Sequence, residues 1–191
     1  MRIISGIHKG KRITAPKNDA IRPTTDFAKE ALFNILNHNF YFSELAVLDL
    51  CCGIGSISFE FGSRGCSNII SVDQQSSTLS FINNTAKQLD LNITTVKSDL
   101  FKFLDKTPLT FDVIFTDPPY SFTKEQFERI VKTTFDRNLL LEDGYLIVDS
   151  AIAETLEFTL SLYDEDEQLM LGYYESDTYS NVEHQLAAGK Y

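Results

Sequence analysis

The sequence predicts an α/β fold: a doubly wound, mostly parallel sheet preceded by an N-terminal β-hairpin and a helix. From residue 46 to residue 149, short apolar runs alternate with amphipathic segments, which is the pattern of strands that alternate with helices. The first of these runs, Val47–Leu50, passes directly into a turn that contains two glycines, as in ligand-binding sheets of this class. The chain of 191 residues has 15 Phe and 8 Tyr, enough apolar surface for one folded core.

The N-terminal part is expected to form a hairpin and then a helix. Arg2–Ser5 and Lys11–Ala15 alternate apolar and polar residues around a glycine-bearing connection, which predicts two short paired strands. Thr24 or Thr25 can cap the helix that follows, over residues 26–37, where apolar residues recur at helical spacing. We therefore expect residues 1–40 to form an N-terminal extension of the domain at 41–191.

The parallel sheet is expected to contain five strands joined by helices, with an antiparallel edge. The predicted strands are Val47–Leu50, Asn68–Asp73, Ile93–Val96, Phe111–Thr116 and Tyr145–Asp149, and the predicted helices lie near Gly55–Ser63, Ser76–Leu89 and Lys124–Phe135. Towards the end, Leu156–Leu162 and Gln168–Tyr174 flank an acidic turn. They predict two more strands, which add an antiparallel last strand to the sheet.

Composition excludes several classes of protein. No apolar run approaches the roughly 20 residues that span a bilayer, so no membrane association is expected. The first residues return to charge after every few apolar positions, unlike a secretory signal. The three cysteines are an odd number without zinc spacing, which is typical of a reducing cytoplasm.

Charge is distributed unevenly along the chain. The formal net charge is −10, but residues 1–30 hold seven basic side chains against three acidic ones. Residues 142–191 hold twelve acidic side chains against a single lysine. The acidic total argues against a protein that coats nucleic acid non-specifically. The basic N-terminal stretch is either a solvated face or a place of contact with phosphate.

The glycine turn after the first strand of the sheet is a candidate ligand site. Glycine permits positive φ and lets a ligand approach the backbone, and Gly53 and Gly55 stand where such a turn needs them. The third glycine of a dinucleotide fingerprint is replaced by Ser58, and no phosphate-loop lysine follows. The alternative is an ordinary turn between a strand and a helix.

Carboxylates accompany this turn and the ends of the next two strands. Asp49 lies within the turn motif, and Asp73 ends the next strand, where it can accept hydrogen bonds from both hydroxyls of a ribose. The alternative for Asp73 is a helix cap. Asp99 follows the third strand and can either accept a bond from an adenine amino group or cap the segment that begins at Leu100.

The most specific motif ends the fourth strand, Phe111–Thr116, with Asp117, Pro118, Pro119 and Tyr120. Two prolines remove two backbone donors and leave outward-facing carbonyl oxygens beside a carboxylate and an aromatic ring. Asp117 and a proline carbonyl can each accept one N–H of an exocyclic amino group while Tyr120 stacks on the base. In the alternative, the prolines merely end a strand.

With these residues assembled, the chain resembles class I S-adenosylmethionine-dependent amino methyltransferases. More narrowly, it resembles the bacterial family that methylates the N2 amino group of a guanine in 16S ribosomal RNA. The resemblance covers roughly residues 1–150. The matching residues are Arg2–Gly6, Lys9–Lys11, Arg22–Asp26, Glu30–Leu36, Val47–Leu50, Gly53, Gly55, Ser63–Gly65, Asp73 and Asp117–Tyr120.

The resemblance implies a role for each part of the site. The cofactor-binding set is Asp49, Gly53, Gly55, Asp73, Asp99, Arg22, Pro23 and Thr24. The catalytic set is Asp117, Pro118, Pro119 and Tyr120, and the RNA-binding set is Arg2, Lys9, Lys11, Arg12 and Lys29. The resemblance also implies S-adenosylmethionine as cofactor, a cytoplasmic enzyme and 16S RNA within a small-subunit assembly intermediate as substrate. No metal is implied, because the sulfonium already activates the methyl group.

Two other functions stay open on the sequence alone. A DNA adenine methylase shares the Asp-Pro-Pro-Tyr motif but usually carries a separate target-recognition region. A non-catalytic RNA-binding or ribosome-assembly module would retain the fold without the chemistry.

Cys51 and Cys52 stand where the family usually has an aromatic and a small residue. They could be nucleophiles, but amino methylation needs none. We therefore expect them to pack around the turn.

Overall fold

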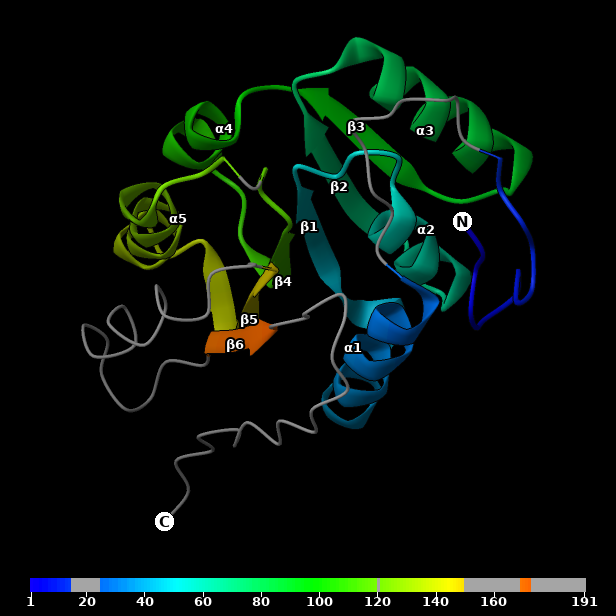
Figure 1. The fold of residues 1–191 in the computed structure, drawn as a ribbon. Helices are drawn as coiled ribbons and strands as arrows, with labels where there is room; N and C mark the ends of the chain where they lie inside the picture. The colour runs from blue at the N-terminus through cyan, green and yellow to red at the C-terminus, as the bar shows by residue number, and fades with distance from the viewer. Residues whose placement is uncertain (15–24, 120, 150–168, 173–191) are drawn as a thin grey trace.

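The computed structural model describes residues 1–14, 25–119, 121–149 and 169–172. A six-stranded sheet forms the centre of the molecule, in the order β3-β2-β1-β4-β5-β6 (Figure 1). The strands are β1 (Ala46–Leu50), β2 (Asn68–Asp73), β3 (Ile93–Lys97), β4 (Phe111–Thr116), β5 (Leu140–Asp149) and β6 (Leu169–Gly172). The helices are α1 (Asp26–Asn39), α2 (Ser56–Ser63), α3 (Ser76–Gln88), α4 (Leu100–Lys106) and α5 (Lys124–Asp136).

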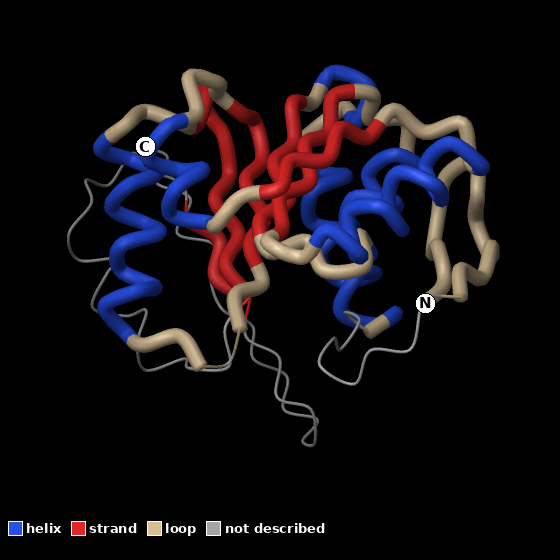
Figure 2. Tube along the Cα trace, turned by 90° about the horizontal axis from the view of Figure 1, so that it is seen from above, coloured by secondary structure: helices blue, strands red, loops and turns tan. Residues whose placement is uncertain are grey.

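Helices cover both faces of the sheet, as Figure 2 shows from above. Successive strand residues point to opposite faces, so the apolar strands supply two separate cores. Val47 and Val113 belong to the buried cluster that includes side chains of α1, α2 and α3. Leu48 and Ile114 belong to the cluster that includes side chains of α4 and α5. The predicted doubly wound α/β class is therefore confirmed.

The predicted helix at residues 26–37 is α1, which runs two residues further, to Asn39. Its cap is Thr25, whose hydroxyl accepts a hydrogen bond from the Ala28 N–H at 3.1 Å. The other predicted helices and strands of the sheet are present with ends that differ by at most one residue. The exception is β5, which begins at Leu140 instead of Tyr145 because Leu140 pairs with Phe111 before a register shift.

The prediction of an antiparallel last strand was wrong. β6 lies parallel to β5, and Leu146 pairs with Leu169 and Asp149 with Gly172. The acidic turn suggested a hairpin, but a parallel pair needs a crossover of a dozen residues or more, and residues 150–168 are long enough to provide one. The other predicted strand of this edge, Leu156–Leu162, lies outside the described residues.

The N-terminal hairpin is present as an antiparallel pairing of residues 1–3 with residues 11–13, and the predicted end of its second strand, Ala15, lies outside the described residues. The bridge joins Arg2 to Arg12, and the Ile3 N–H donates to the Lys11 carbonyl at 3.0 Å. Ile3 and Ile13 point into the same core as α1 and α2, which fixes the hairpin to the domain. Over the described part of the chain, no helix is long and apolar enough to cross a bilayer.

Candidate functional site

Four acidic residues and the glycine turn meet at the carboxyl edge of the sheet. Leu50 pairs with Val72 on one side and with Thr116 on the other, and Thr116 in turn pairs with Val148. One position further along each strand, the chain places Cys51, Asp73, Asp117 and Asp149 in one row, and Asp49 lies two residues before Cys51. The sequence motifs on β1, β2 and β4 are thus brought together as predicted.

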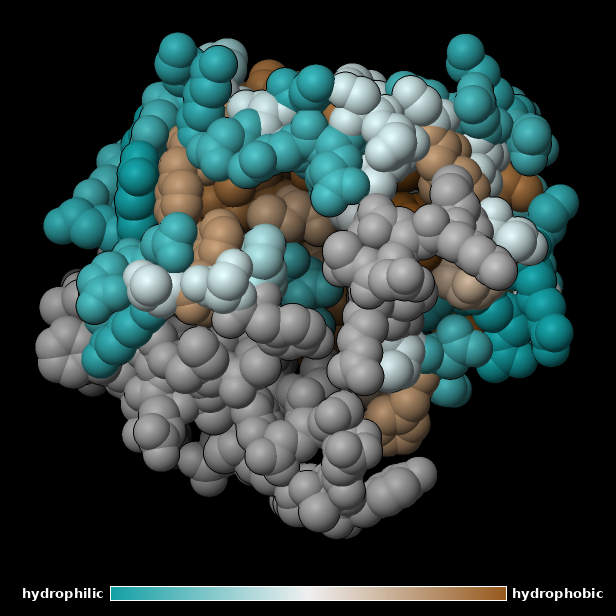
Figure 3. All heavy atoms as spheres, turned by 45° about the horizontal axis from the view of Figure 1, so that its top comes forward, coloured by the Kyte–Doolittle hydropathy of each residue, from teal (hydrophilic) through white to brown (hydrophobic). Residues whose placement is uncertain are grey.

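Figure 3 tilts this edge towards the viewer. Apolar residues line a hollow there, and hydrophilic residues form much of its border. Ligands of open parallel sheets bind in this position, outside the carboxyl ends of the strands.

The glycine turn is tight and requires left-handed backbone conformations. Cys51, Gly53 and Gly55 have φ values of 54°, 50° and 77°. A Cβ on Gly55 would lie 2.9 Å from Cγ1 of Ile82 on α3, so any other residue would have to displace the Ile82 side chain. Gly55 directly precedes α2 and thereby brings the first turn of this helix close to β1.

The Ser56 hydroxyl offers a test of whether a ligand fits beside this turn. It is buried at the first position of α2, and it has no hydrogen-bond partner among the described residues. A buried hydroxyl is normally paired, so its free capacity suits a polar ligand at the glycine turn. The amino-acid part of S-adenosylmethionine has the polar groups to use it.

Asp73 ties the glycine turn to the end of β2. Its Oδ2 accepts a hydrogen bond from the Gly53 N–H at 3.0 Å, and its Oδ1 accepts one from the Gln75 N–H at 2.8 Å. The cap of α3 is Gln75, so the simple helix-cap interpretation of Asp73 was wrong. The half-buried carboxylate keeps lone pairs that can accept further bonds from ligand hydroxyls.

Asp49 lies beneath the turn and is fully buried. Its Oδ2 accepts bonds from the Ser58 N–H at 3.1 Å and the Ser58 hydroxyl at 2.5 Å. Burial raises the pKa of Asp49 to about 7, although the bonds from Ser58 oppose this and the charge of Asp73 adds to it. Ser58 therefore anchors α2 to β1, at the position where a dinucleotide fingerprint would have its third glycine.

Asp99 is the cap of α4, which confirms one of its two interpretations. Its Oδ1 accepts a bond from the Lys102 N–H at 3.0 Å, and its Oδ2 accepts one from the Gln74 side chain at 2.9 Å. The Gln74 contact links the end of β2 to the start of α4. The adenine contact stays a prediction, and it is compatible with capping because a carboxylate has several acceptor positions.

Asp117 is half-buried directly after β4. Burial raises its pKa to about 7, with further contributions from the charges of Asp149 and Asp49. Pro118 is buried, and the Pro119 carbonyl accepts a bond from the Phe122 N–H at 2.9 Å, which closes the turn after the motif. Tyr120, like Arg22, Pro23 and Thr24 of the predicted cofactor pocket, lies outside the described residues.

The two adjacent cysteines are packing residues. Burial, followed by the charges of Asp73 and Asp117, raises the pKa of Cys51 to about 12, and burial raises that of Cys52 as well. Such thiols are protonated near neutral pH, whereas a nucleophilic cysteine needs its thiolate. Both are free, and Cys52 belongs to the apolar core.

The predicted RNA contacts separate into exposed and buried side chains. Lys9, Lys11 and Arg12 are exposed on the hairpin, and the exposed Arg2 pairs with Asp26 at 3.0 Å. Lys29 is 1% exposed.

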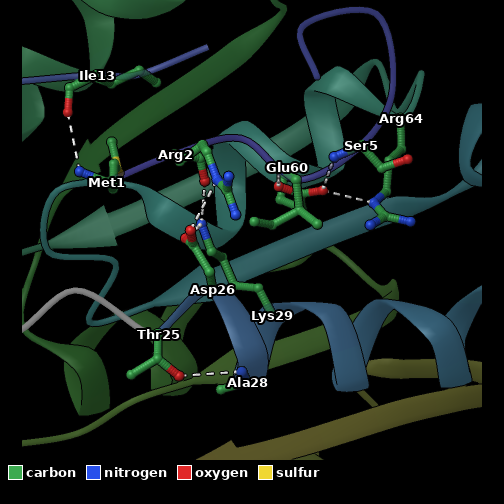
Figure 4. Close-up of polar contacts among 11 residues, drawn as sticks. Met1, Arg2, Ser5, Ile13, Thr25, Asp26, Ala28, Lys29, Glu60 and Arg64 are labelled. Carbon is green, nitrogen blue, oxygen red and sulfur yellow. Dashed lines mark hydrogen bonds and ion pairs between the residues drawn. The ribbon is translucent and has the colours of Figure 1, made fainter. Parts of the chain in front are cut away.

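A surface contact with RNA through Lys29 was therefore a wrong prediction. Lys29 lies on the buried face of α1, with its Nζ 2.5 Å from the Arg2 carbonyl oxygen and 3.5 Å from Oδ1 of Asp26 (Figure 4). Its ammonium group holds the hairpin against α1.

A buried glutamate, which the sequence analysis missed, docks the hairpin on α2. Glu60 accepts bonds from the Ile4 N–H at 2.8 Å, the Ser5 N–H at 3.0 Å and the Arg64 Nε at 2.9 Å (Figure 4). A signal was present, because Glu60 is a single charge between two phenylalanines of a helix. The Ile7 N–H of the hairpin also donates to the carbonyl of Ser63, the last residue of α2, at 2.7 Å. The basic hairpin and the glycine turn therefore lie at opposite ends of one short helix.

Within residues 1–14, 25–119, 121–149 and 169–172, no group of three or more His, Cys, Asp or Glu side chains is arranged to hold a metal ion. The fold, the glycine turn with its carboxylate on β2, and the Asp-Pro-Pro motif on β4 together define a methyltransferase.

The chain belongs to the family described as "Conserved hypothetical protein 95", whose model matches residues 1–168. It is 34% identical over 155 residues to "Putative rRNA methyltransferase YlbH" of Bacillus subtilis, covering 78% of this chain and 82% of that protein. It is 28% identical over 158 residues to "Ribosomal RNA small subunit methyltransferase D" of Escherichia coli, covering 82% and 77%.

The comparison with solved structures confirms the fold. The structure of "Putative methyltransferase yhhF from Escherichia coli" aligns with a TM-score of 0.65 at 24% identity, covering 74% of this chain and 75% of that one. A structure from Haemophilus influenzae described as a methylase gives 0.64 at 23%, covering 78% and 80%.

Proposed function

We propose that this chain is a cytoplasmic S-adenosylmethionine-dependent enzyme that methylates the exocyclic N2 amino group of a guanine in 16S ribosomal RNA. The observation that supports it most is the placement of Asp117 and Asp73 in one row on either side of the glycine turn. One carboxylate can bind the cofactor while the other binds the amino group that receives the methyl group. Membership of a family with ribosomal RNA methyltransferases supports the substrate class.

The residues that would hold the cofactor are those around the turn. Asp73 would accept bonds from the ribose hydroxyls, Gly53 and Gly55 would admit the amino-acid part, and Asp99 would receive the adenine amino group. Arg22, Pro23 and Thr24 would close the pocket. When bound, S-adenosylmethionine supplies a methyl group that its sulfonium makes electrophilic.

The residues that would act on the substrate follow β4. Asp117 would accept one N–H of the guanine amino group, and a carbonyl of Pro118 or Pro119 would accept the other. These bonds favour a pyramidal nitrogen and aim its lone pair at the methyl group, so they strengthen as the transition state forms. Tyr120 would stack on the base, which must leave its own stack to enter the site.

The hairpin would supply the contact with RNA phosphates through Arg2, Lys9, Lys11 and Arg12, at the far end of α2 from the glycine turn. Few basic groups and an acidic remainder predict weak binding to naked RNA. We therefore propose an assembly intermediate of the small subunit as the substrate, because its proteins add basic surface that complements the acidic residues 142–191.

The test compares purified 16S RNA with partly assembled small-subunit particles, each treated with labelled S-adenosylmethionine at several salt concentrations. We expect efficient methylation of the particles and slow methylation of the naked RNA. Equal methylation of both would contradict the particle requirement. Labelled DNA adenine would favour the DNA methylase instead, and absence of cofactor binding in calorimetry would favour a non-catalytic module.

A further inference from the structure

Asp149 is an acidic residue of the site that no motif singled out. It is the last residue of β5, and its neighbour Val148 pairs with Thr116, so Asp149 lies beside Asp117, the residue that follows β4. Neighbouring strands lie about 4.8 Å apart, and residues in one row of a parallel sheet face the same side. On its other side Asp149 pairs with Gly172 of β6, a residue without a side chain.

The surroundings of this pair are acidic. Burial raises the pKa of Asp149 to about 6, and burial together with the charge of Asp149 and, less, of Asp49 raises that of Asp117 to about 7. After burial, the charges of Asp73, Asp117, Asp49 and Asp99 raise the pKa of the Cys51 thiol, which lies between β2 and β4 in the same row. Among the residues that the structure describes, the groups that act on Asp117 include no basic side chain. The charge of Asp149 therefore opposes the ionisation of Asp117, which lies next to it in the sheet.

Methylation of an amino group requires a proton acceptor. The nitrogen lone pair forms the new N–C bond, the C–S electron pair stays on sulfur, and one N–H proton must leave the nitrogen. An isolated aspartate, with a pKa near 3.9, is a weak base at neutral pH. A general base works best when its pKa lies near the operating pH.

We propose that Asp149 is a positioning residue that acts through Asp117: its charge, next to Asp117 in the sheet, adds to the effect of burial and favours Asp117 as the acceptor of the proton that the target amino group loses. The proton moves from nitrogen to Asp117 and from there to water. This assignment rests on the proposed amino methylation, and it adds to it the residue that tunes the acceptor.

The test removes the charge without changing the shape. Asp149→Asn is the isosteric variant, Asp149→Ser is a smaller uncharged one, and Asp149→Glu keeps the charge. Asp136→Asn makes the same charge change at the exposed end of α5. The first readout is the titration of the Asp117 carboxyl by carbon NMR in the protein alone, and the second is the pH profile of methylation.

We expect Asp117 to titrate at lower pH in Asp149→Asn and in Asp149→Ser. In Asp149→Glu, which keeps the charge, and in Asp136→Asn, which lies elsewhere, Asp117 should titrate as in the wild type. The ratio of the methylation rates at pH 6 and pH 8 should rise roughly fivefold in Asp149→Asn, as loss of one neighbouring charge predicts. An unchanged Asp117 titration in a folded, uncharged variant would overturn the proposal. So would a slower enzyme with an unchanged pH profile, since that is the signature of a merely structural role.

The two proposals can fail separately. If wild-type protein leaves ribosomal RNA unmethylated, the proposed function is wrong. The NMR titration needs neither cofactor nor RNA, so it decides independently whether Asp149 acts on Asp117.

Discussion

Replacement of Asp73 by alanine should weaken cofactor binding and loosen the glycine turn at the same time. The carboxylate accepts the Gly53 N–H at 3.0 Å and the Gln75 N–H at 2.8 Å, and it would also accept the ribose hydroxyls. Loss of charge-assisted bonds to the ribose costs about 1.5–3 kcal/mol, which corresponds to an affinity roughly 10- to 150-fold lower. Because the site is half-buried, water can replace the carboxylate at the two N–H groups, and the free energy of unfolding should fall by only about 1–2 kcal/mol.

Isothermal titration calorimetry with S-adenosylmethionine and with its demethylated product measures the first effect, and urea denaturation measures the second. Asp136→Ala removes an exposed carboxylate far from the turn in sequence and serves as the control. Asp73→Asn, which keeps one acceptor oxygen, should lie between wild type and Asp73→Ala. Unchanged affinity in Asp73→Ala would refute the assignment of this carboxylate to the ribose.

Three further predictions address catalysis, RNA binding and the docking of the hairpin. Asp117→Ala should lower turnover by at least about 100-fold while calorimetry shows little change in cofactor affinity, because the hydrogen bonds of Asp117 to the amino group strengthen in the transition state. Equal losses of turnover and cofactor affinity would make Asp117 a structural residue. Joint replacement of Lys9, Lys11 and Arg12 by alanine should strongly reduce RNA methylation and flatten its salt dependence while cofactor affinity stays intact; an unaffected variant would exclude the hairpin from RNA binding. Glu60→Ala should destabilise the protein by about 3 kcal/mol in urea denaturation, because three donors lose their buried acceptor, and a change below about 1 kcal/mol would contradict the docking role.

The order of the elements could be predicted because local signals agree with the tertiary structure. The strand that contains Val47 and Leu48 is apolar on both faces, as a strand covered by helices on both sides must be. Thr25 and Asp99 have the side chains that cap helices, and both do so. The position of Asp73 and Asp117 in one row follows from the parallel order alone.

The features that sequence reasoning missed depend on long-range contacts. In the sequence, Lys29 looks like one more basic residue of the N-terminal stretch. In the structure, α1 directs its side chain towards the Arg2 carbonyl. Glu60 acquires its role from the backbone of Ile4, 56 residues away in the chain. Asp149 matters because its strand lies beside β4, and the direction of β6 depends on a pairing that no local pattern contains.

The activity that we propose for this site is the transfer of a methyl group to the N2 amino group of a guanine in ribosomal RNA. The most direct measurement is nucleoside mass spectrometry of small-subunit RNA after incubation of assembly particles with the purified protein and S-adenosylmethionine that carries a deuterated methyl group. We expect deuterated N2-methylguanosine in the wild-type reaction and its loss with Asp117→Ala. Label in another nucleoside, or in none while the protein binds the cofactor, would contradict it.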